Sequence, residues 1–396
     1  MEDAGAGSPK RTLVRRASLK GGVSRPLVTP IQPSVVYASP SIAALHGQYT
    51  GGAEGYTYAR EGHPNADLLA EKIDFLEGGE GGLITGSGMA AVTAVLMGLV
   101  SAGDHVVGGD QLYGRSLRLM HQDLARFGIA TSLADAGDGA ALRAAVRPET
   151  KLILVETVSN PTLRIADMAA AVDIARELGA ILAVDNTFAT PRGYRPFDHG
   201  ADVVIHSVTK LLAGHADVTL GYVSARDPDH RKAIYDFAVT TGLTPSPYEC
   251  WLAERGLYTF ELRYDRAEAN AAQLAEYLAG HPAVARVVYP GRSDHPDRAQ
   301  AARLLGNRSG YMVTFEIAGD EAAADRLVQA AHDLAFAPTL GDIGTTLSHP
   351  ASSSHRGLTP EARAALGISD GMFRVSVGIE DLDVLLADFD VALAAV

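Results

Sequence analysis

The sequence predicts an α/β protein with a mainly parallel sheet, followed by a smaller α+β domain. From residue 81 onward, apolar runs typical of strands alternate with helix-like patterns and glycine turns. The runs are continuously apolar, as in strands covered on both faces. Strands that alternate with helices indicate parallel pairing. After about residue 255 glycine turns become fewer, and long helical patterns alternate with strands.

The elements follow in order along the chain. The segment GGLITGSGMAAVTAVLMGLVSAGDHVVGGD predicts a strand, a glycine turn, a helix and a second strand. Further strands are expected at 152–157, Ile181–Asp185 and Val203–Ser207, and in TLGYVSA. The second part predicts a helix ending at Gly280, strands in VARVVYPG, YMVTFEIAG and MFRVSVGIE, and a helix near 321–334. Ligands of such sheets bind beyond the carboxyl ends of the strands, where the sequence places four polar residues: Thr85, Glu156, Asp185 and Ser207.

Composition restricts the classes of function. Apolar residues make up 47% and charged residues 20%, which excludes a mainly disordered chain. A net charge of −13 disfavours nucleic-acid binding. A single cysteine, Cys250, excludes an internal disulfide framework and a cysteine-rich metal cluster. The longest apolar run, 88–100, is too short to span a bilayer. We therefore expect a soluble, cytoplasmic protein without a membrane partner.

The first 25 residues form a basic segment with six basic and two acidic side chains. No apolar core follows the Arg15-Arg16 pair, so we expect a basic arm rather than a secretory signal.

The segment ADVVIHSVTKLLAGHADVTLGYV places Lys210 just past a buried strand. A desolvated lysine is a strong candidate for a Schiff base, and Ser207 and Thr209 could bind a phosphate. The alternative is an ordinary surface lysine. Asp185 ends another apolar strand 25 residues earlier. It needs a cationic partner if it is buried and ionised, and a protonated pyridine nitrogen would serve; the alternative is an Asp that caps the next turn.

The turn TGSGMAAV places Gly86, Ser87, Gly88 and Met89 at the start of a predicted helix. Backbone N–H groups and the helix dipole make such a turn an anion site. The turn also matches G-x-G-x-x-A, and Asp110 lies 24 residues after Gly86. This spacing is close to that of a dinucleotide-binding motif, so a nicotinamide-dependent oxidoreductase is the main alternative.

These segments, together with GYTYAREGHPN, DQLYGRS, ETVSNPTL, VDNTFATP and FRVSVGIE, resemble the Cys/Met-metabolism enzymes that use pyridoxal 5′-phosphate (PLP). The resemblance runs from about residue 27 to the C-terminus. It implies a fold type I PLP-dependent transferase-like architecture with a mainly parallel seven-stranded sheet flanked by helices. It further implies an N-terminal arm (1–63) that contributes to the neighbouring subunit's site, a large PLP-binding domain (64–257), a small C-terminal domain (258–396) and a homotetramer built from active dimers.

The resemblance implies three catalytic residues. Lys210 forms a Schiff base with PLP and later moves protons between substrate carbons. Asp185 keeps the pyridine nitrogen protonated, so that the ring can act as an electron sink. Tyr113 stacks on the ring and is available as an acid or base toward the leaving group.

The resemblance also implies the binding residues. Tyr58 and Arg60 reach the coenzyme phosphate from the neighbouring subunit, and Arg60 can bond it in two places. Asn160 bonds the ring hydroxyl. Arg374 clamps the substrate α-carboxylate with help from Thr339. The phosphate is held within one chain by four residues: Gly88, Met89, Ser207 and Thr209.

Several of these residues have plainer explanations. Tyr58 and Tyr113 could be half-buried aromatics, Arg374 a solvated strand residue, and Asn160 a turn former before Pro161. His206 and His215 flank the lysine segment, but no His-x-x-x-His motif or cysteine partner supports a metal site. We therefore expect both histidines to be structural and no metal to be bound.

The residues of the outer pocket must determine the reaction, because the same catalytic residues support both γ-elimination and γ-replacement. Pro338 stands where cystathionine-cleaving relatives carry a glutamate, which favours a neutral thioether. Arg118 could bind a distal carboxylate. Arg115 replaces the cysteine typical of methionine γ-lyases, and Thr339 replaces a usual serine.

The sequence thus predicts a methionine γ-lyase-like enzyme that gives a 2-oxo acid, ammonia and a thiol. Within the family, the alternatives are cystathionine γ-synthase, O-acylhomoserine sulfhydrylase and cystathionine γ-lyase. Outside it, they are the nicotinamide-dependent oxidoreductase and a protein that binds PLP without catalysis.

Overall fold

The computed structural model describes residues 23–396, so most of the expected basic arm lies outside the described residues. The chain divides into two units after Pro30, and every element described below belongs to the second, Ile31–Val396. That unit begins with the short helix α1 (Ile42–Tyr49) and an isolated bridge between Val36 and Tyr58. Within residues 23–396, no helix combines the length and apolarity needed to cross a bilayer.

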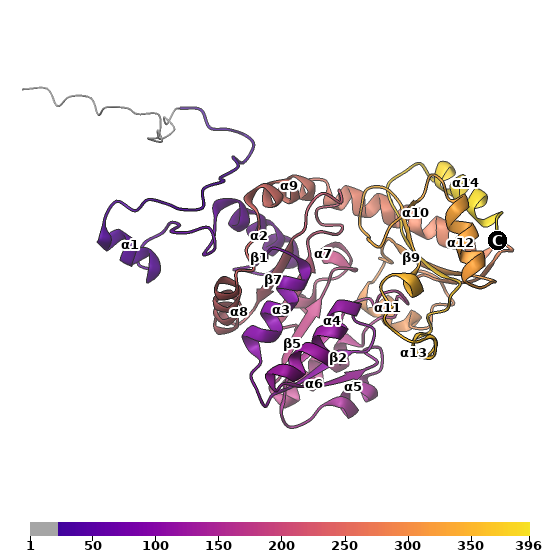
Figure 1. Cartoon of the computed structure of the whole chain (residues 1–396), viewed down its shortest axis with the longest axis horizontal. Coiled ribbons are helices and arrows are strands. Elements are labelled where there is room, and N and C mark those ends of the chain that lie inside the picture. Colours follow the sequence, from indigo (N-terminus) through magenta and orange to yellow (C-terminus); the bar gives the residue numbers. More distant parts are fainter. Residues whose placement is uncertain (1–22) are drawn as a thin grey trace, which may run out of the picture. The chain divides into compact units, whose positions relative to one another are not determined.

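A sheet flanked by helices lies at the centre of the larger part of the second unit (Figure 1). It has seven strands in the order β1-β7-β6-β5-β4-β2-β3. Its strands are β1 (Leu83–Thr85), β2 (His105–Gly109), β3 (Ala130–Ala134), β4 (Thr150–Glu156), β5 (Ile181–Asp185), β6 (Val203–Ser207) and β7 (Gly221–Ala225). Strands β2 to β6 pair in parallel, whereas β7 is antiparallel to both β6 and β1. The predicted α/β class with a mainly parallel sheet is confirmed.

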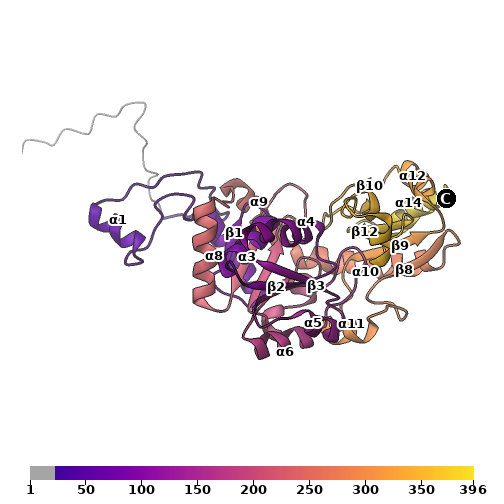
Figure 2. The ribbon, with the colours of Figure 1, turned by 60° about the horizontal axis from the view of Figure 1, so that its bottom comes forward.

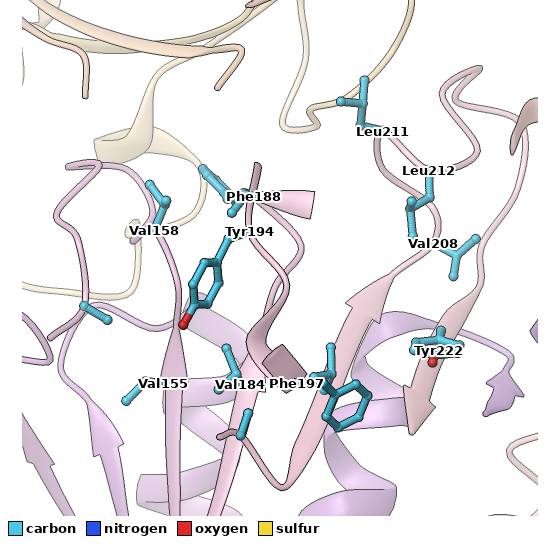
Figure 3. Close-up of a cluster of buried hydrophobic side chains, with 14 of the residues drawn as sticks. Val155, Val158, Val184, Phe188, Tyr194, Phe197, Val208, Leu211, Leu212 and Tyr222 are labelled. Carbon is cyan, nitrogen blue, oxygen red and sulfur yellow. The ribbon is translucent and has the colours of Figure 1, made fainter. Parts of the chain in front are cut away.

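Helices cover both faces of this sheet, which explains the continuously apolar strands. On one face α3 (Gly88–Leu99) and α8 (Pro228–Thr241) lie side by side (Figure 2), and they share a core with Val106, Leu154 and Ile205. The opposite core contains Val155 and Val184 (Figure 3). Its helices are α2 (Pro64–Glu77), α6 (Met168–Leu178) and α9 (Pro247–Leu257).

Shorter elements complete the larger part. After β2 come α4 (Gly114–Arg118), a π-helical turn at Leu119–Asp123 and a 3-10 turn at Leu124–Phe127. Helix α5 (Gly139–Ala145) follows β3. Helix α7 (Thr190–Gly193) and a 3-10 turn at Pro196–His199 follow β5.

A second sheet of five strands has the order β10-β11-β12-β9-β8 and its own core around Phe315, Phe373 and Phe389. Its strands are β8 (Val284–Val288), β9 (Met312–Ile317), β10 (Ala335–Phe336), β11 (Thr346–Ser348) and β12 (Met372–Ser376). The accompanying helices are α10 (Phe260–Ala279), α11 (Arg298–Leu304), α12 (Glu321–Ala330), α13 (Pro360–Ala365) and α14 (Leu382–Leu393), with a 3-10 turn at Pro350–Ser352. A smaller α+β part is confirmed, while the boundaries 1–63, 64–257 and 258–396 stay a prediction.

One loop of the smaller part reaches the carboxyl ends of the large sheet. Gly341 has a φ of 79°, and a Cβ at this position would lie 2.3 Å from the backbone nitrogen of Leu211. Only glycine tolerates both the left-handed backbone and this approach. The loop that follows β10 therefore packs directly against the backbone next to Lys210.

Candidate active site

A cavity of about 410 Å³ lies beyond the carboxyl ends of β4, β5 and β6. The larger sheet with its helices and loops supplies most of the wall. The loop before Gly341, strand β12 and residues 353–356 supply the rest. It brings together eleven of the residues that the sequence analysis selected: Gly88, Met89, Tyr113, Asn160, Asp185, Ser207, Thr209, Lys210, Thr339, Arg374 and the helix-capping Ser87.

Lys210 lies in the turn after β6, and its side chain enters this cavity. Its Nζ atom is 3.5 Å from Oγ1 of Thr339. Burial lowers the pKa of Lys210 to about 8, and the positive charge of Arg374 acts in the same direction. The unprotonated amine, which is the form that attacks a carbonyl group, is therefore far more populated near neutral pH than in an exposed lysine.

Asp185 is the last residue of β5, and its carboxyl group also faces the cavity. Its Oδ1 atom accepts hydrogen bonds from the Thr187 hydroxyl at 2.6 Å and from the Thr187 N–H at 3.1 Å. Burial raises the pKa of Asp185, whereas the two Thr187 bonds and the charge of His206 lower it. The Asp185 side chain thus bonds the following turn and also lines the cavity, while its role toward a ligand stays a prediction.

The start of α3 forms an anion-favouring corner of the cavity. The Oγ atom of Ser87 accepts a hydrogen bond from the Ala90 N–H at 3.0 Å and so caps the helix. A Cβ at Gly88 would lie 2.7 Å from Cβ of Ser207, so only glycine lets the helix end approach β6 this closely. The free N–H groups and the helix dipole favour a phosphate here. The Thr209 hydroxyl is already bonded to the backbone of Leu220.

Arg374 is buried in β12, with 5% of its surface exposed, which excludes a solvated strand residue. Its Nη1 donates to Asn160 Oδ1 at 2.7 Å and its Nη2 to the Thr339 carbonyl at 2.8 Å. Burial lowers the pKa of Arg374 to about 10, so it stays charged at neutral pH. Its buried Nε has no partner, and no carboxylate among residues 23–396 pairs with the guanidinium. Such a charge calls for an anionic ligand.

Tyr113 precedes α4 and is attached to the sheet through its backbone. Its N–H donates to Oε1 of Glu156, the last residue of β4, at 2.6 Å. The Tyr113 side chain lines the cavity and stays 42% exposed. The sequence motifs assign no role to Glu156, although an ionisable residue at the end of an apolar strand is the same signal that identifies Asp185.

Two further arginines, Arg115 and Arg356, line the exposed side of the same cavity. Arg356 donates to the Ser353 carbonyl at 3.0 Å, and neither guanidinium forms an ion pair within the described part of the chain. A Cβ at Gly114 would lie 2.6 Å from the Ser354 carbonyl oxygen, so the two loops that carry these arginines are in contact. In the sequence, Arg115 is marked only as a departure from a motif, and no motif selects Arg356.

Three selected residues do not line the cavity in this chain. Arg118 is 57% exposed and lies 4.0 Å from Asp123. The guanidinium of Arg60 stacks 5.0 Å from the Tyr58 ring and lies 3.7 Å from Glu61. The roles expected of Arg118, Arg60 and Tyr58 stay predictions.

The two histidines that flank Lys210 have protein partners. His206 is fully buried and hydrogen-bonds Glu77, which also accepts from Asn186 Nδ2 at 2.9 Å. His215 Nδ1 bonds the Ala213 carbonyl oxygen at 2.7 Å. Across residues 23–396, no three His, Cys, Asp or Glu side chains gather in a way that could hold a metal ion.

Comparison with known proteins gives consistent matches. The model of the family described as "Cys/Met metabolism PLP-dependent enzyme" matches residues 12–394. The chain is 40% identical over 370 residues to L-methionine gamma-lyase of Pseudomonas putida, covering 93% of both chains. It is 40% identical over 359 residues to O-succinylhomoserine sulfhydrylase of Pseudomonas aeruginosa, covering 91% of this chain and 89% of the relative. The solved cystathionine gamma synthase of Xanthomonas oryzae pv. oryzae in complex with cystathionine has a TM-score of 0.87 and 40% identity, and the match covers 93% of each chain.

Proposed function

Because the chain belongs to the Cys/Met metabolism PLP-dependent enzymes, we propose that it catalyses γ-elimination from a sulfur amino acid. The products are a 2-oxo acid, ammonia and a thiol. The observation that carries this proposal is the presence of Lys210 and the unpaired Arg374 in one cavity. A nucleophilic amine and a charge that lacks a carboxylate partner are the two groups that an amino-acid enzyme of this kind requires. Family membership also removes the support for a nicotinamide-dependent oxidoreductase.

The residues of the cavity fit PLP. Lys210 offers an amine of lowered pKa to the coenzyme aldehyde. Asp185 offers a half-buried carboxylate, stabilised by two hydrogen bonds from Thr187, to the ring nitrogen. Gly88 lets the N-terminus of α3 pack closely against Ser207, and the N–H groups at this helix end can bind the coenzyme phosphate. Bound PLP supplies an electron sink for the negative charge that develops at the substrate Cα.

The side chains of the protein then orient the substrate and move its protons. Arg374 binds the α-carboxylate with its guanidinium fork. Thr339 connects the carboxylate-binding Arg374 with Lys210. Its carbonyl oxygen accepts a hydrogen bond from Arg374, and its hydroxyl lies next to Nζ of Lys210. The Lys210 amine takes the proton from Cα and returns it at a later carbon. The Tyr113 phenol is available to protonate the leaving sulfur.

Methionine is the reference substrate of this proposal. Pro338 lines the outer part of the cavity, where an apolar wall favours a neutral thioether. The relative from Pseudomonas putida bears the name of a methionine gamma-lyase. Pro338 supports this choice of substrate, and Arg115 and Arg356 oppose it.

A second candidate is turnover of a substrate whose γ-substituent ends in a carboxylate, by elimination or by γ-replacement with a thiol. The specific observation is the presence of Arg115 and Arg356 at the cavity without ion-pair partners. Relatives at 40% identity are named for O-succinylhomoserine and for cystathionine, which both carry a distal carboxylate. Arg115 and Arg356, which lie on two loops that contact each other, could together bind a distal carboxylate.

A product assay tests both candidates. The holoenzyme is incubated with methionine, homocysteine, cystathionine, O-acetylhomoserine or O-succinylhomoserine, with and without a thiol acceptor. The 2-oxo acid and the new thioether are then measured. Turnover of methionine to 2-oxobutyrate without a thiol supports the first candidate, and thiol-dependent thioether formation supports γ-replacement. No turnover of any of these substrates would refute both.

Paired variants test the substrate preference. In the second candidate, Arg115→Ala and Arg356→Ala weaken O-succinylhomoserine turnover much more than methionine turnover. Arg118→Ala is the matched control, because Arg118 lies outside the cavity. An equal loss of turnover for O-succinylhomoserine and methionine would show that these arginines do not bind the distal carboxylate.

A further inference from the structure

Two carboxyl groups lie side by side at the floor of the coenzyme cavity. Glu156 ends β4 and Asp185 ends β5, and the two residues are paired partners in the parallel sheet. Both line the cavity, and they are its only acidic residues among those described. Two neighbouring carboxyl groups, one of them with a buried oxygen atom, cannot both ionise at low cost, so one of them tends to keep its proton.

The hydrogen bonds indicate which group ionises. Asp185 receives two donors from Thr187 and is further favoured by the charge of His206. Glu156 receives one donor, the Tyr113 N–H, and its buried Oε2 atom has no partner. Burial raises the pKa of Glu156 well above its usual range, and the negative charge of Asp185 raises it further. The environment therefore favours ionised Asp185 beside protonated Glu156.

Among residues 23–396, no free cation behind Glu156 compensates a negative charge on it. A small cavity on that side is lined by Asp110, Asp135 and Arg164. Arg164 is engaged by Asp297 at 2.6 Å and lies 3.6 Å from Asp135. The pKa of Asp110 is itself raised by burial and by Asp135. On the coenzyme side, the positively charged groups are Lys210, Arg374, Arg115 and Arg356.

Glu156 also holds the loop that carries Tyr113. Tyr113 stands at the N-terminal end of α4, where its side chain makes no capping bond. Its backbone N–H bond to Glu156 therefore attaches the start of this short helix to the end of β4. A shift of the Glu156 carboxyl group would move the Tyr113 ring relative to the coenzyme.

We propose that Glu156 is a positioning residue that works as a neutral carboxylic acid. Its Oε1 atom fixes the backbone of Tyr113, and its uncharged state leaves Asp185 as the single carboxylate next to the coenzyme ring. The geometry of Tyr113 and the charge at the ring nitrogen are thereby set by one side chain.

Substitution of the holoenzyme distinguishes a neutral acid from a carboxylate. Glu156→Gln keeps the Oε1 acceptor and has no charge, so the pH titration of coenzyme absorption keeps its wild-type midpoint. Glu156→Ala removes the attachment of Tyr113, and kcat/KM falls by about 100-fold, the cost of a misplaced catalytic group. For Glu156→Gln, kcat/KM falls far less than for Glu156→Ala. Glu149→Gln, an exposed position before the same strand, is the control.

Two results would overturn the proposal. If Glu156 is ionised, Glu156→Gln removes a negative charge and lowers the midpoint of the coenzyme titration by about one pH unit or more. A loss of kcat/KM in Glu156→Gln as large as in Glu156→Ala would also contradict it. Infrared spectroscopy of wild-type holoenzyme at neutral pH gives an independent readout, because a protonated carboxyl group has its own carbonyl band. The band is expected in wild type and absent in Glu156→Gln, and its absence from wild type would refute the neutral state.

Discussion

The substitution Arg374→Lys tests the substrate clamp most directly. The arginine uses Nη1 for Asn160 and Nη2 for the Thr339 carbonyl, while Nε remains without a partner. Lysine keeps the positive charge but lacks the planar fork, so it cannot hold both protein partners and bond a carboxylate in two places. The expected defect is in binding and orienting the substrate rather than in holding the coenzyme.

The magnitude follows from the burial of this charge. Truncating one partner of a buried, hydrogen-bonded charge pair costs about 2–5 kcal/mol. Because lysine keeps the charge, we expect the lower part of that range, about 2–3 kcal/mol, which corresponds to a loss of roughly 30- to 150-fold in kcat/KM. Arg374→Ala leaves the substrate carboxylate without a cation, so we expect the upper part of the range and a loss of about a thousandfold or more.

The assay is steady-state formation of the 2-oxo acid together with the absorption spectrum of the coenzyme. We expect KM to rise strongly while the spectrum without substrate stays close to that of wild type. Arg303→Lys, on the exposed face of α11, is the control for handling and folding. A kcat/KM for Arg374→Lys within about threefold of wild type would mean that this guanidinium does not bind the substrate.

Three further predictions concern the coenzyme. Lys210→Ala abolishes turnover and leaves PLP held without a covalent link, as borohydride reduction and absorption spectra can show; substantial activity would contradict the role of Lys210. Asp185→Ala loses most of the rate although PLP still binds, and near-normal kcat would exclude Asp185 as the partner of the ring nitrogen. Attachment of PLP to coenzyme-free protein accelerates as pH rises through about 8, because only the unprotonated Lys210 amine attacks; a rate that does not change with pH between neutral and alkaline conditions would refute the lowered pKa.

The buried strands could be read from the sequence because their environment is uniform. Parallel strands covered on both faces need continuous apolar runs, and Ile181–Asp185 and Val203–Ser207 occur in the structure with the predicted bounds. The strand predicted at 152–157 spans Thr150–Glu156 instead. Polar residues at its ends obscure the boundary, since Thr150 and Lys151 continue the backbone ladder without continuing the apolar pattern.

The outer wall of the cavity could not be read in this way. Arg115 lines the cavity and Arg118 does not, and a loop of the smaller part that is far away in the sequence contacts Gly114 beside Arg115. The same long-range contact brings Arg356 to the site. The state of Glu156 likewise depends on its strand neighbour Asp185 and on its burial, neither of which a local pattern encodes.

The expected sharing of the site between subunits has a separate test. In the single chain, Arg60 and Tyr58 contact each other and do not line the coenzyme cavity. If Arg60 serves the neighbouring subunit, then Lys210→Ala and Arg60→Ala protein should complement each other after subunit exchange. A mixed dimer holds one site that combines Lys210 of one chain with Arg60 of the other, and its second site lacks both.

The activity expected after subunit exchange can be calculated from the fraction of intact sites. With random pairing, half of the dimers are mixed and half of their sites are intact, so about a quarter of wild-type activity returns. The matched control mixes Lys210→Ala with Asp185→Ala. Because Lys210 and Asp185 lie in the cavity of one chain, no mixed site regains both residues and no activity returns. If the mixture of Lys210→Ala and Arg60→Ala protein regains no activity, although Arg60→Ala alone is clearly impaired, then Arg60 acts in the site of its own chain. The argument that the active site requires a dimer would then be lost.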